Sequence, residues 1–491
     1  MKKFLIIFTG EFFGLTEYYL INYLINQSTG ISMATIGTLG DDNLVLTINT
    51  ELVYGDTDGT LANTQKGGSD KITVTGSSND ISGDAQDITD QAKGGDDELT
   101  VQGDENNVIG DASGNISGLA SGGQDKVTVT GNRNILAGDT FSEIESNAKG
   151  GDDELTAIGN QNDLGGDANV MLGNAKGGND KLTATGDENF VGGDAYDLMG
   201  GDAQGGEDDL SVAGNNNVVA GDSVLIMADN AQGGKDKLTA TGDGNILSGD
   251  ARQMFNTAKG GSDELKAEGN GNNLVGDARD MFDNSLGGND KLDAEGNENN
   301  LFGDAREMRG NAQGGNDELK VKGNNNTLFG DAASMYDTAK GGNDKLEGGD
   351  GDDTLYGDAE LMSSGSLGGN DELNGGKGND FLIGTANGIA EVDKLTGDDG
   401  SDTFVLGDAT KAFYLGNGNT DYALLDDFKI NQADSILLHG SASDYTLGAA
   451  PNGLPGGTGI FQQSDGDLIG IVKGVALGSL NLTNPDVFEY V

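Results

Sequence analysis

The chain has 491 residues and a formal net charge of −54, with 82 acidic and 28 basic side chains. So much negative charge disfavours nucleic acids and anionic membranes as partners. The absence of cysteine excludes disulfides, thiolate metal sites and thiol catalysis. The acidic residues recur at fixed places along the chain, and this placement indicates that cations form part of the structure.

Residues 1–33 open with two lysines and the apolar run FLIIF, which is typical of the start of a signal peptide. Glu11 interrupts this run, which is far too short to span a bilayer. We therefore predict that residues 1–33 are an upstream extension or an atypical leader. A short amphipathic helix is the alternative.

From residue 67 to residue 384 one unit of 27 or 28 residues recurs, and its cleanest copy extends from Gly314 to Lys340. A fixed period in this range indicates a solenoid, in which stacked units share one continuous core. Residues 34–66 already contain the Gly-Asp pair, here called the GD step, that recurs in the later units. They are predicted to form an N-terminal capping coil.

Each unit divides into three pieces. The first alternates apolar and polar residues, so that Leu182 and Ala184 are expected to point inward from a short strand. The second has the form G-x-x-N-x-φ-x-G-D, where φ stands for Ile, Val or Leu. This form indicates a turn followed by a second short strand. The third places Ala305, Met308 and Ala312 at helical spacing, which predicts a short helix-like turn with a methionine column in the core.

These pieces predict an all-β dominated fold, a parallel β-solenoid or β-roll with coils of about 27 residues and a C-terminal β cap. The alternative is a coil of about 18 residues, in which alternate units face opposite sides. Each unit begins with the motif GG-x-D. The residue after its aspartate alternates between positive and negative charge along the chain, from Lys71 and Glu98 to Lys345 and Glu372. In a one-unit coil these side chains form an ion-pair ladder that sets the register, although duplication of a two-unit block would leave the same pattern.

The GG-x-D aspartates do not alternate with any other residue type. Stacked about 4.8 Å apart, neighbouring carboxylates repel by about 3.5 kcal/mol at an effective dielectric constant near 20. Hard oxygen ligands on a flexible glycine backbone suit Ca²⁺ better than Mg²⁺. The predicted calcium ligands are Asp70, Asp97, Asp125, Asp153, Asp180, Asp208, Asp236, Asp263, Asp290, Asp317, Asp344 and Asp371.

Two more columns accompany them. The aspartates of the GDA step are open to two interpretations, as helix N-caps or as further calcium ligands. They are Asp84, Asp111, Asp167, Asp194, Asp250, Asp277, Asp304, Asp331 and Asp358. The recurrent asparagines are expected to form a ladder of hydrogen-bonded amides, and they are Asn79, Asn106, Asn134, Asn162, Asn189, Asn217, Asn245, Asn272, Asn299 and Asn326.

The segments GGDGDDTLYGD from Gly348 and GGKGNDFLIG from Gly375 match the nonapeptide GGxGxDxUx. In these segments, and over roughly residues 38–491, the chain resembles the repeats-in-toxin (RTX), or haemolysin-type calcium-binding, family. DKLTGDDGSDTFVLG from Asp393 looks like the usual close of such an array. The resemblance implies a secreted protein with Ca²⁺ between the turns of a parallel β-roll. It implies as ligands Asp350, Asp352, Asp353, Asn379, Asp380, Asp399, Ser401 and Asp402.

Residues 385–491 contain all three prolines and several apolar strands. We predict that they close the open edge of the solenoid, which would otherwise aggregate. This region is also similar to the uncleaved C-terminal signal that RTX proteins present to type I secretion machinery. Cell-surface polysaccharide and self-assembly are the other expected interactions.

The only histidine is His439, so no H-E-x-x-H zinc motif exists and no catalytic constellation stands out. We therefore expect a non-enzymatic, extracellular, calcium-binding structural or cell-surface protein. The alternative is a non-catalytic RTX module of a carbohydrate-active or other secreted enzyme. An ice-binding face is disfavoured because its threonine pairs recur only in alternate units.

Overall fold

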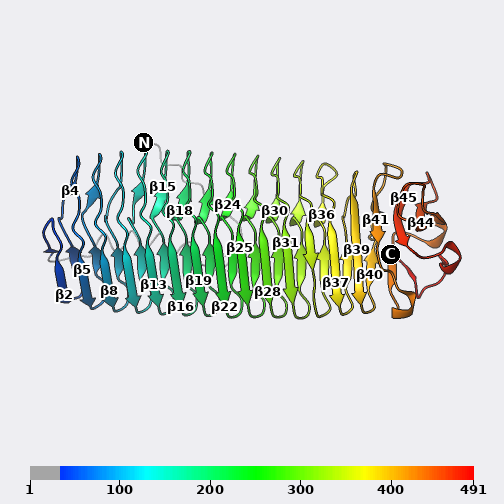
Figure 1. Cartoon of the computed structure of the whole chain (residues 1–491), viewed down its shortest axis with the longest axis horizontal. Coiled ribbons are helices and arrows are strands. Elements are labelled where there is room, and N and C mark those ends of the chain that lie inside the picture. Colours follow the sequence, from blue (N-terminus) through cyan, green and yellow to red (C-terminus); the bar gives the residue numbers. More distant parts are fainter. Residues whose placement is uncertain (1–33) are drawn as a thin grey trace.

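The computed structural model describes residues 34–491, which form an elongated β-solenoid closed at its C-terminal end by a smaller β cap (Figure 1). The predictions made for residues 1–33 lie outside this range. Successive coils contribute strands to parallel sheets that extend along the solenoid, and each strand lies across the long axis.

The first sheet, here called the long-strand sheet, is built from the first piece of each unit. Its solenoid strands are β2 (Asn43–Thr47), β5 (Lys71–Thr75), β8 (Glu98–Gln102), β10 (Lys126–Thr130), β13 (Glu154–Ile158), β16 (Lys181–Thr185), β19 (Asp209–Ala213), β22 (Lys237–Thr241), β25 (Glu264–Glu268), β28 (Lys291–Glu295), β31 (Glu318–Lys322), β34 (Lys345–Glu347), β37 (Glu372–Lys377) and β39 (Val392–Asp399).

The second sheet, the short-strand sheet, is built from the second piece. Its strands are β1 (Ala34–Ile36), β3 (Leu52–Tyr54), β6 (Asp80–Ser82), β9 (Asn107–Ile109), β11 (Ile135–Ala137), β14 (Asp163–Gly165), β17 (Phe190–Gly192), β20 (Val218–Ala220), β23 (Ile246–Ser248), β26 (Asn273–Val275), β29 (Asn300–Phe302), β32 (Thr327–Phe329), β35 (Thr354–Tyr356), β38 (Phe381–Ile383), β40 (Thr403–Val405), β42 (Ser435–Leu438) and β46 (Phe488–Tyr490).

The third piece of the unit also forms strands, which make up the methionine sheet. They are β12 (Glu143–Ile144), β15 (Ala168–Met171), β18 (Ala195–Met199), β21 (Ser223–Met227), β24 (Ala251–Met254), β27 (Ala278–Met281), β30 (Ala305–Met308), β33 (Ala332–Met335) and β36 (Ala359–Met362). Towards the N-terminus β4 (Thr60–Leu61) pairs with β7 (Asp87–Ile88).

The predicted helix-like turn is therefore wrong. The backbone of this piece bonds to neighbouring coils, as where the Arg309 N–H donates to the Met281 carbonyl at 2.9 Å. Ala305 and Met308 are both fully buried although three positions separate them, whereas Arg306 is exposed and Glu307 is half-buried. Elsewhere in this sheet, the pairing of β15 with β18 contains a register shift of the kind that a β-bulge produces. Two inward residues at this spacing imitate a helical pattern, and within residues 34–491 the only helical turns are the 3₁₀ segments η1 (Ile430–Gln432), η2 (Ala442–Asp444) and η3 (Leu477–Ser479).

The pairing register shows that one unit makes one coil. Lys126 pairs with Glu98 of the coil before it and with Glu154 of the coil after it. This register confirms the one-unit coil and excludes the 18-residue alternative for the repeats. It also confirms the ion-pair ladder, with Lys71 Nζ 2.7 Å from Glu98 Oε1 and Lys126 Nζ 2.6 Å from Glu154 Oε2. Such exposed pairs contribute roughly 0–1 kcal/mol each, so their value lies in opposing a slip by one unit.

The core is a narrow column of apolar side chains enclosed by the three sheets. Leu182 and Ala184 point inward as predicted, and both are fully buried. Met308 and Ala312 are also fully buried, which confirms the methionine column as core packing. Because each coil buries few apolar residues, the core stays continuous only while the coils remain in register.

Non-repeating strands cover the C-terminal end of the core. β41 (Tyr422–Leu425) pairs in parallel with β39 and with β45 (Leu468–Lys473). The antiparallel strands β43 (Tyr445–Ala449) and β44 (Gly457–Gln462) follow β45 in the sheet. Phe404, Phe428 and Phe488 are buried beneath this cap.

We predict that Met254→Ala lowers the free energy of unfolding by about 2–5 kcal/mol, because a buried methionine leaves a cavity. The control is Gln253→Ala, which truncates the adjacent, partly exposed side chain of the same strand. Urea denaturation in excess calcium measures both variants. Equal losses would contradict the inward orientation of Met254.

Candidate metal sites

Two columns of buried aspartates lie side by side in the solenoid. The GG-x-D column is the set Asp70–Asp371 predicted from the sequence, and each member directly precedes a long strand. The GD column follows each short strand and consists of Asp56, Asp84, Asp111, Asp139, Asp167, Asp194, Asp222, Asp250, Asp277, Asp304, Asp331 and Asp358. The GD column lies where the chain leaves the short-strand sheet, and the GG-x-D column lies where the chain enters the long-strand sheet. These two points are neighbours in the coil, so carboxylates of the two columns meet inside the coil.

Carboxylates from both columns converge on common points. Ligand oxygens of Asp84, Asp97 and Asp111 all lie within 4.8 Å of one another, and all three residues are buried. Two further groups follow this one along the solenoid, Asp111–Asp125–Asp139 and Asp139–Asp153–Asp167. In each group one GG-x-D aspartate lies between two successive GD aspartates.

Each GG-x-D carboxylate is satisfied on one oxygen only. The Asp97 N–H donates to Asp125 Oδ1 at 2.7 Å, and the Asp125 N–H donates to Asp153 Oδ1 at 2.6 Å. This bond links successive coils and directs the second oxygen, Oδ2, into the coil. That oxygen is buried and has no hydrogen-bond partner in any of the twelve aspartates from Asp70 to Asp371.

The GD aspartates bind the glycine pair that follows them. The Gly95 N–H donates to Asp84 Oδ2 at 2.7 Å, and the Gly123 N–H donates to Asp111 Oδ2 at 2.7 Å. The interpretation of this column as helix N-caps is wrong, because the segment that follows is a strand. The other oxygen of Asp84 and of Asp111 is buried without a partner, as in most of the column.

The glycine of the GD step forms a small oxygen-lined cradle. A Cβ atom added at Gly83 would lie 1.8 Å from the Gly110 carbonyl oxygen and 2.0 Å from Asp97 Oδ2. The same two oxygens, one coil further on, surround Gly110. Only glycine leaves this space open, and a backbone carbonyl therefore joins the carboxylates as a potential ligand.

The electrostatics of the columns require a counter-charge. Burial, together with the charge of the nearby Asp84 carboxylate, raises the pKa of Asp97 to about 9. Burial also holds the pKa of Asp84 and of Asp111 well above the usual value. Two ionised carboxylates about 4.8 Å apart repel by about 3.5 kcal/mol at an effective dielectric constant of 20. The columns must therefore take up protons or bind cations, and their oxygen-only donors suit a hard metal ion.

The asparagine column is an amide ladder, as predicted, with Nδ2 bonds from Asn79 to Asn217. Asn245, Asn272 and Asn299 keep only the backbone N–H bond to the next asparagine, and their Nδ2 atoms are buried without a partner. Asn79 donates from its backbone N–H and from Nδ2 to Asn106 Oδ1, at 3.0 and 2.9 Å. Asn106 repeats this pattern towards Asn134. The ladder passes into carboxylates at Asp353, whose Oδ1 accepts the Asn326 N–H at 2.8 Å.

The ligands implied by the RTX resemblance separate into two sets. Asp353, Asp380 and Asp402 continue the asparagine column and are buried, each with an unpartnered Oδ2. Asp350, Asp352, Asn379, Asp399 and Ser401 lie on the exposed turns. There Asp350 pairs with Lys377 at 2.7 Å, and Asp352 Oδ1 accepts the Asn379 N–H at 2.7 Å. The structure therefore does not bring this second set together with the buried carboxylates.

Sequence reasoning missed several members of the columns. Asp139 and Asp222 belong to the GD column but stand in GDT and GDS steps rather than GDA. The glycine–aspartate pair at the same position of the unit was the signal that identifies them. Glu391 is also buried, with Oε1 unpartnered, and burial raises its pKa to about 10. No repeat pattern marks Glu391.

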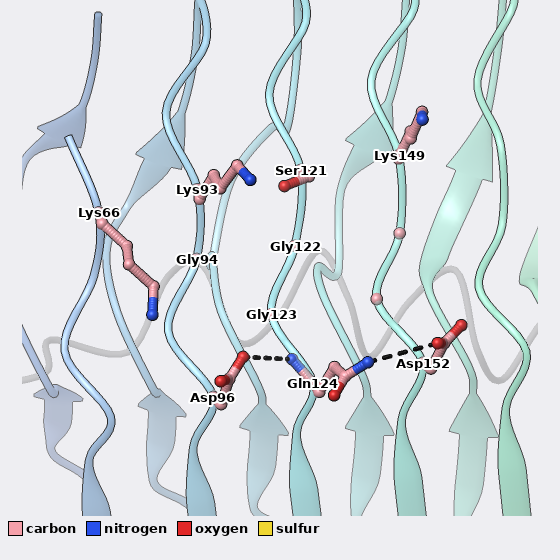
Figure 2. A pocket seen from close by; sticks show the side chains of 12 residues that line it. Lys66, Lys93, Gly94, Asp96, Ser121, Gly122, Gly123, Gln124, Lys149 and Asp152 are labelled. Carbon is pink, nitrogen blue, oxygen red and sulfur yellow. Dashed lines mark hydrogen bonds between the residues drawn. The ribbon is translucent and has the colours of Figure 1, made fainter. Parts of the chain in front are cut away.

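Exposed acids of the same turns differ from the buried ones. Figure 2 shows a groove lined by Lys66, Lys93 and Lys149 and by Asp96 and Asp152, with Ser121 on the coil between Lys93 and Lys149. Gln124 bridges the two aspartates, with its N–H 3.2 Å from Asp96 Oδ1 and its Nε2 3.3 Å from Asp152 Oδ2. The groove thus contains both signs of charge and protein partners for its acids, whereas the buried Oδ2 atoms have none.

His439 has a structural contact in the C-terminal cap. Its Nδ1 lies 2.7 Å from the Asp408 carbonyl oxygen.

Comparison with known proteins finds no matching protein-family model and no matching curated sequence. Among residues 34–491, no helix has the length and apolar character needed to cross a membrane.

We predict opposite effects of Asp97→Asn with and without cations. In metal-free buffer the variant keeps its β signal to a higher pH than the wild type, because one like charge leaves the cluster. In calcium it unfolds at a lower temperature, with a loss of about 1–3 kcal/mol, because one charged ligand is gone. A pH titration of the cation-free chain and a thermal melt in calcium, both followed by circular dichroism, measure the two effects. The control is Asp96→Asn at the exposed neighbour, and equal responses of the two variants to calcium would contradict the assignment.

We also predict that acid stabilises the cation-free fold. The aspartates of the columns have higher pKa values in the folded chain than their ordinary value of 3.8, so the folded state binds more protons. Their contribution to the free energy of unfolding is complete below about pH 4. It is lost as the pH rises through the pKa values of the folded chain, about 6 for Asp70 and about 9 for Asp97.

The measurement is far-ultraviolet circular dichroism of chain freed of divalent cations and titrated from pH 4 to pH 9. The β signal is expected to fall with rising pH, and calcium is expected to restore it. A β signal that rises with pH in the cation-free sample would contradict the prediction.

Proposed function

We propose that this protein is an RTX-type calcium-binding solenoid, and that Ca²⁺ completes its fold by occupying the buried aspartate columns. The observation that carries the proposal is the unpartnered Oδ2 of every GG-x-D aspartate from Asp70 to Asp371. A buried, unpaired carboxylate oxygen is costly, and its repetition in every coil calls for a ligand in every coil. The residues fit the ion, because GD and GG-x-D carboxylates with glycine carbonyls form an oxygen-only donor set.

Calcium is favoured over other ions by the chemistry of these donors. The donors include no sulfur or imidazole, which disfavours zinc and copper. Irregular clusters of carboxylates and carbonyls suit the flexible coordination of Ca²⁺, whereas Mg²⁺ requires a compact octahedron and retains water. The RTX-like nonapeptides near the C-terminal end of the repeats support the same ion.

The proposed role is structural and extracellular. Without cations, the charge of −54 expands the chain, and binding energy from many calcium ions becomes folding energy. Extracellular calcium-binding modules have dissociation constants of about 10⁻⁴–10⁻³ M, so such a chain folds after export. The resemblance of residues 385–491 to a type I secretion signal supports this route. The long repetitive surface fits a cell-surface or matrix component rather than an enzyme.

The test is to compare the purified full chain in 1 mM calcium, in 1 mM magnesium and in EGTA. We expect a β spectrum and a small radius of gyration in calcium alone, measured by circular dichroism and small-angle X-ray scattering. A folding midpoint near millimolar calcium supports the extracellular role, and a micromolar midpoint contradicts it. A β spectrum and a melting temperature that do not change in EGTA would refute calcium-dependent folding.

A further inference from the structure

Two further aspartates, Asp42 and Asp393, extend the GG-x-D column by one coil at each end. They differ from the twelve aspartates between them. The Asp42 N–H donates to Asp70 Oδ1 at 2.7 Å, which makes Asp42 the first member. The Asp371 N–H donates to Asp393 Oδ1 at 2.9 Å, which makes Asp393 the last. At both ends the bond between coils is the same as within the column.

At these two ends Oδ2 is not free. Asp42 Oδ2 accepts hydrogen bonds from the Thr38 N–H at 2.5 Å and from Thr38 Oγ1 at 2.9 Å. Asp393 Oδ2 accepts the Tyr414 hydroxyl at 2.6 Å, and both side chains are fully buried. Protein donors thus satisfy the oxygen that has no partner in Asp70–Asp371.

The tyrosine hydroxyl occupies the oxygen-lined cradle itself. A Cβ added at Gly357 would lie 2.3 Å from the Gly384 carbonyl oxygen and 2.5 Å from Asp371 Oδ2. One coil further on, a Cβ added at Gly384 would lie 2.1 Å from the Tyr414 hydroxyl and 2.4 Å from Asp393 Oδ2. The Tyr414 hydroxyl therefore lies where a backbone carbonyl oxygen lies in every earlier coil.

The GD column ends at corresponding positions. Thr38 follows Gly37 as Asp56 follows Gly55, and Thr385 follows Gly384 as Asp358 follows Gly357. The glycine contacts are conserved in this register, since a Cβ at Gly37 would lie 1.7 Å from the Gly55 carbonyl oxygen. Threonine thus replaces the GD aspartate at both ends of the solenoid.

The short carboxylate column on the asparagine edge is closed in the same way. Its members Asp353, Asp380 and Asp402 have an unpartnered Oδ2. Asp434 receives the Asp402 N–H on Oδ1, but its Oδ2 accepts the Lys429 N–H at 2.6 Å. On the other side the column stops at Asn326, whose amide donates to Asp353 Oδ1 at 3.1 Å.

We infer that protein donors take the place of a cation at the column ends, and that Thr38, Tyr414, Asn326 and the Lys429 N–H thereby limit how many cations the protein holds. A neutral donor hydrogen-bonded to the last carboxylate satisfies its second oxygen without a metal ion and lowers the cost of burying its charge. The columns are then closed units of defined capacity rather than open rows that fill from either end. This inference rests on the proposed function.

The experiment counts calcium ions on the full chain by native mass spectrometry. Tyr414→Phe removes the hydroxyl and leaves Asp393 Oδ2 unpartnered beside an open cradle, so the variant is expected to hold one more calcium ion than the wild type. Adding Asp393→Asn to this variant removes the extra carboxylate charge and is expected to restore the wild-type number. The matched control is Tyr422→Phe, a buried tyrosine outside the columns, which is expected to leave the number unchanged.

Asn326→Asp provides a second, independent variant at the other column. It keeps the oxygen that accepts the Asn299 N–H at 3.0 Å but replaces the amide donor with a second oxygen. One additional calcium ion is expected here too. If both Tyr414→Phe and Asn326→Asp fold and bind the same number of ions as the wild type, the inference is overturned. A wild-type chain without bound calcium would instead refute the proposed function.

Discussion

The structure depends on one repeated arrangement, a buried aspartate that accepts a backbone N–H on one carboxylate oxygen and nothing on the other. The N–H belongs to the equivalent aspartate of the preceding coil, as from Asp97 to Asp125. The bond that stacks the coils is therefore the bond that directs the second oxygen inward. Stacking and charge burial cannot be separated, so the fold carries its own requirement for counter-charge.

The coil distributes its polar groups according to what each position can pair with. On the exposed face, lysine alternates with acid, and opposite charges lie in contact. On the asparagine edge, Asn79 and Asn106 use Nδ2 as the donor that a carboxylate lacks. Aspartate and asparagine share the oxygen that accepts the neighbouring N–H. They differ in the second atom, which is an amide nitrogen in asparagine and an unpartnered oxygen in the aspartates from Asp70 to Asp371.

Sequence periodicity predicted most of this arrangement because the same residue stacks on its own copies. It failed in the third piece of the unit, where Ala305 and Met308 are buried at the two ends of one four-residue strand. A spacing of three does not distinguish a helix from such a strand unless the partners of the backbone are known. It also missed Asp139, where threonine replaces the alanine of the GDA step. The aspartate, and not its neighbour, is the part that the column requires.

The sequence by itself determined the repeat length, the recurrent polar residues and the alternating charges, because each follows from identity at a constant interval. That one repeat makes one coil was decided by the strand register. Only the tertiary structure decided which carboxylate oxygens lack a partner and where the columns stop. Tyr414 reaches Asp393 across 21 residues of non-repeating chain, and the Lys429 N–H meets Asp434 through a local turn. Neither contact recurs, so no period reveals it. Each interior repeat of the solenoid contacts copies of itself, so the repeat sequence specifies its contacts. The terminal repeats contact non-repeating segments, and those segments specify the contacts at the ends.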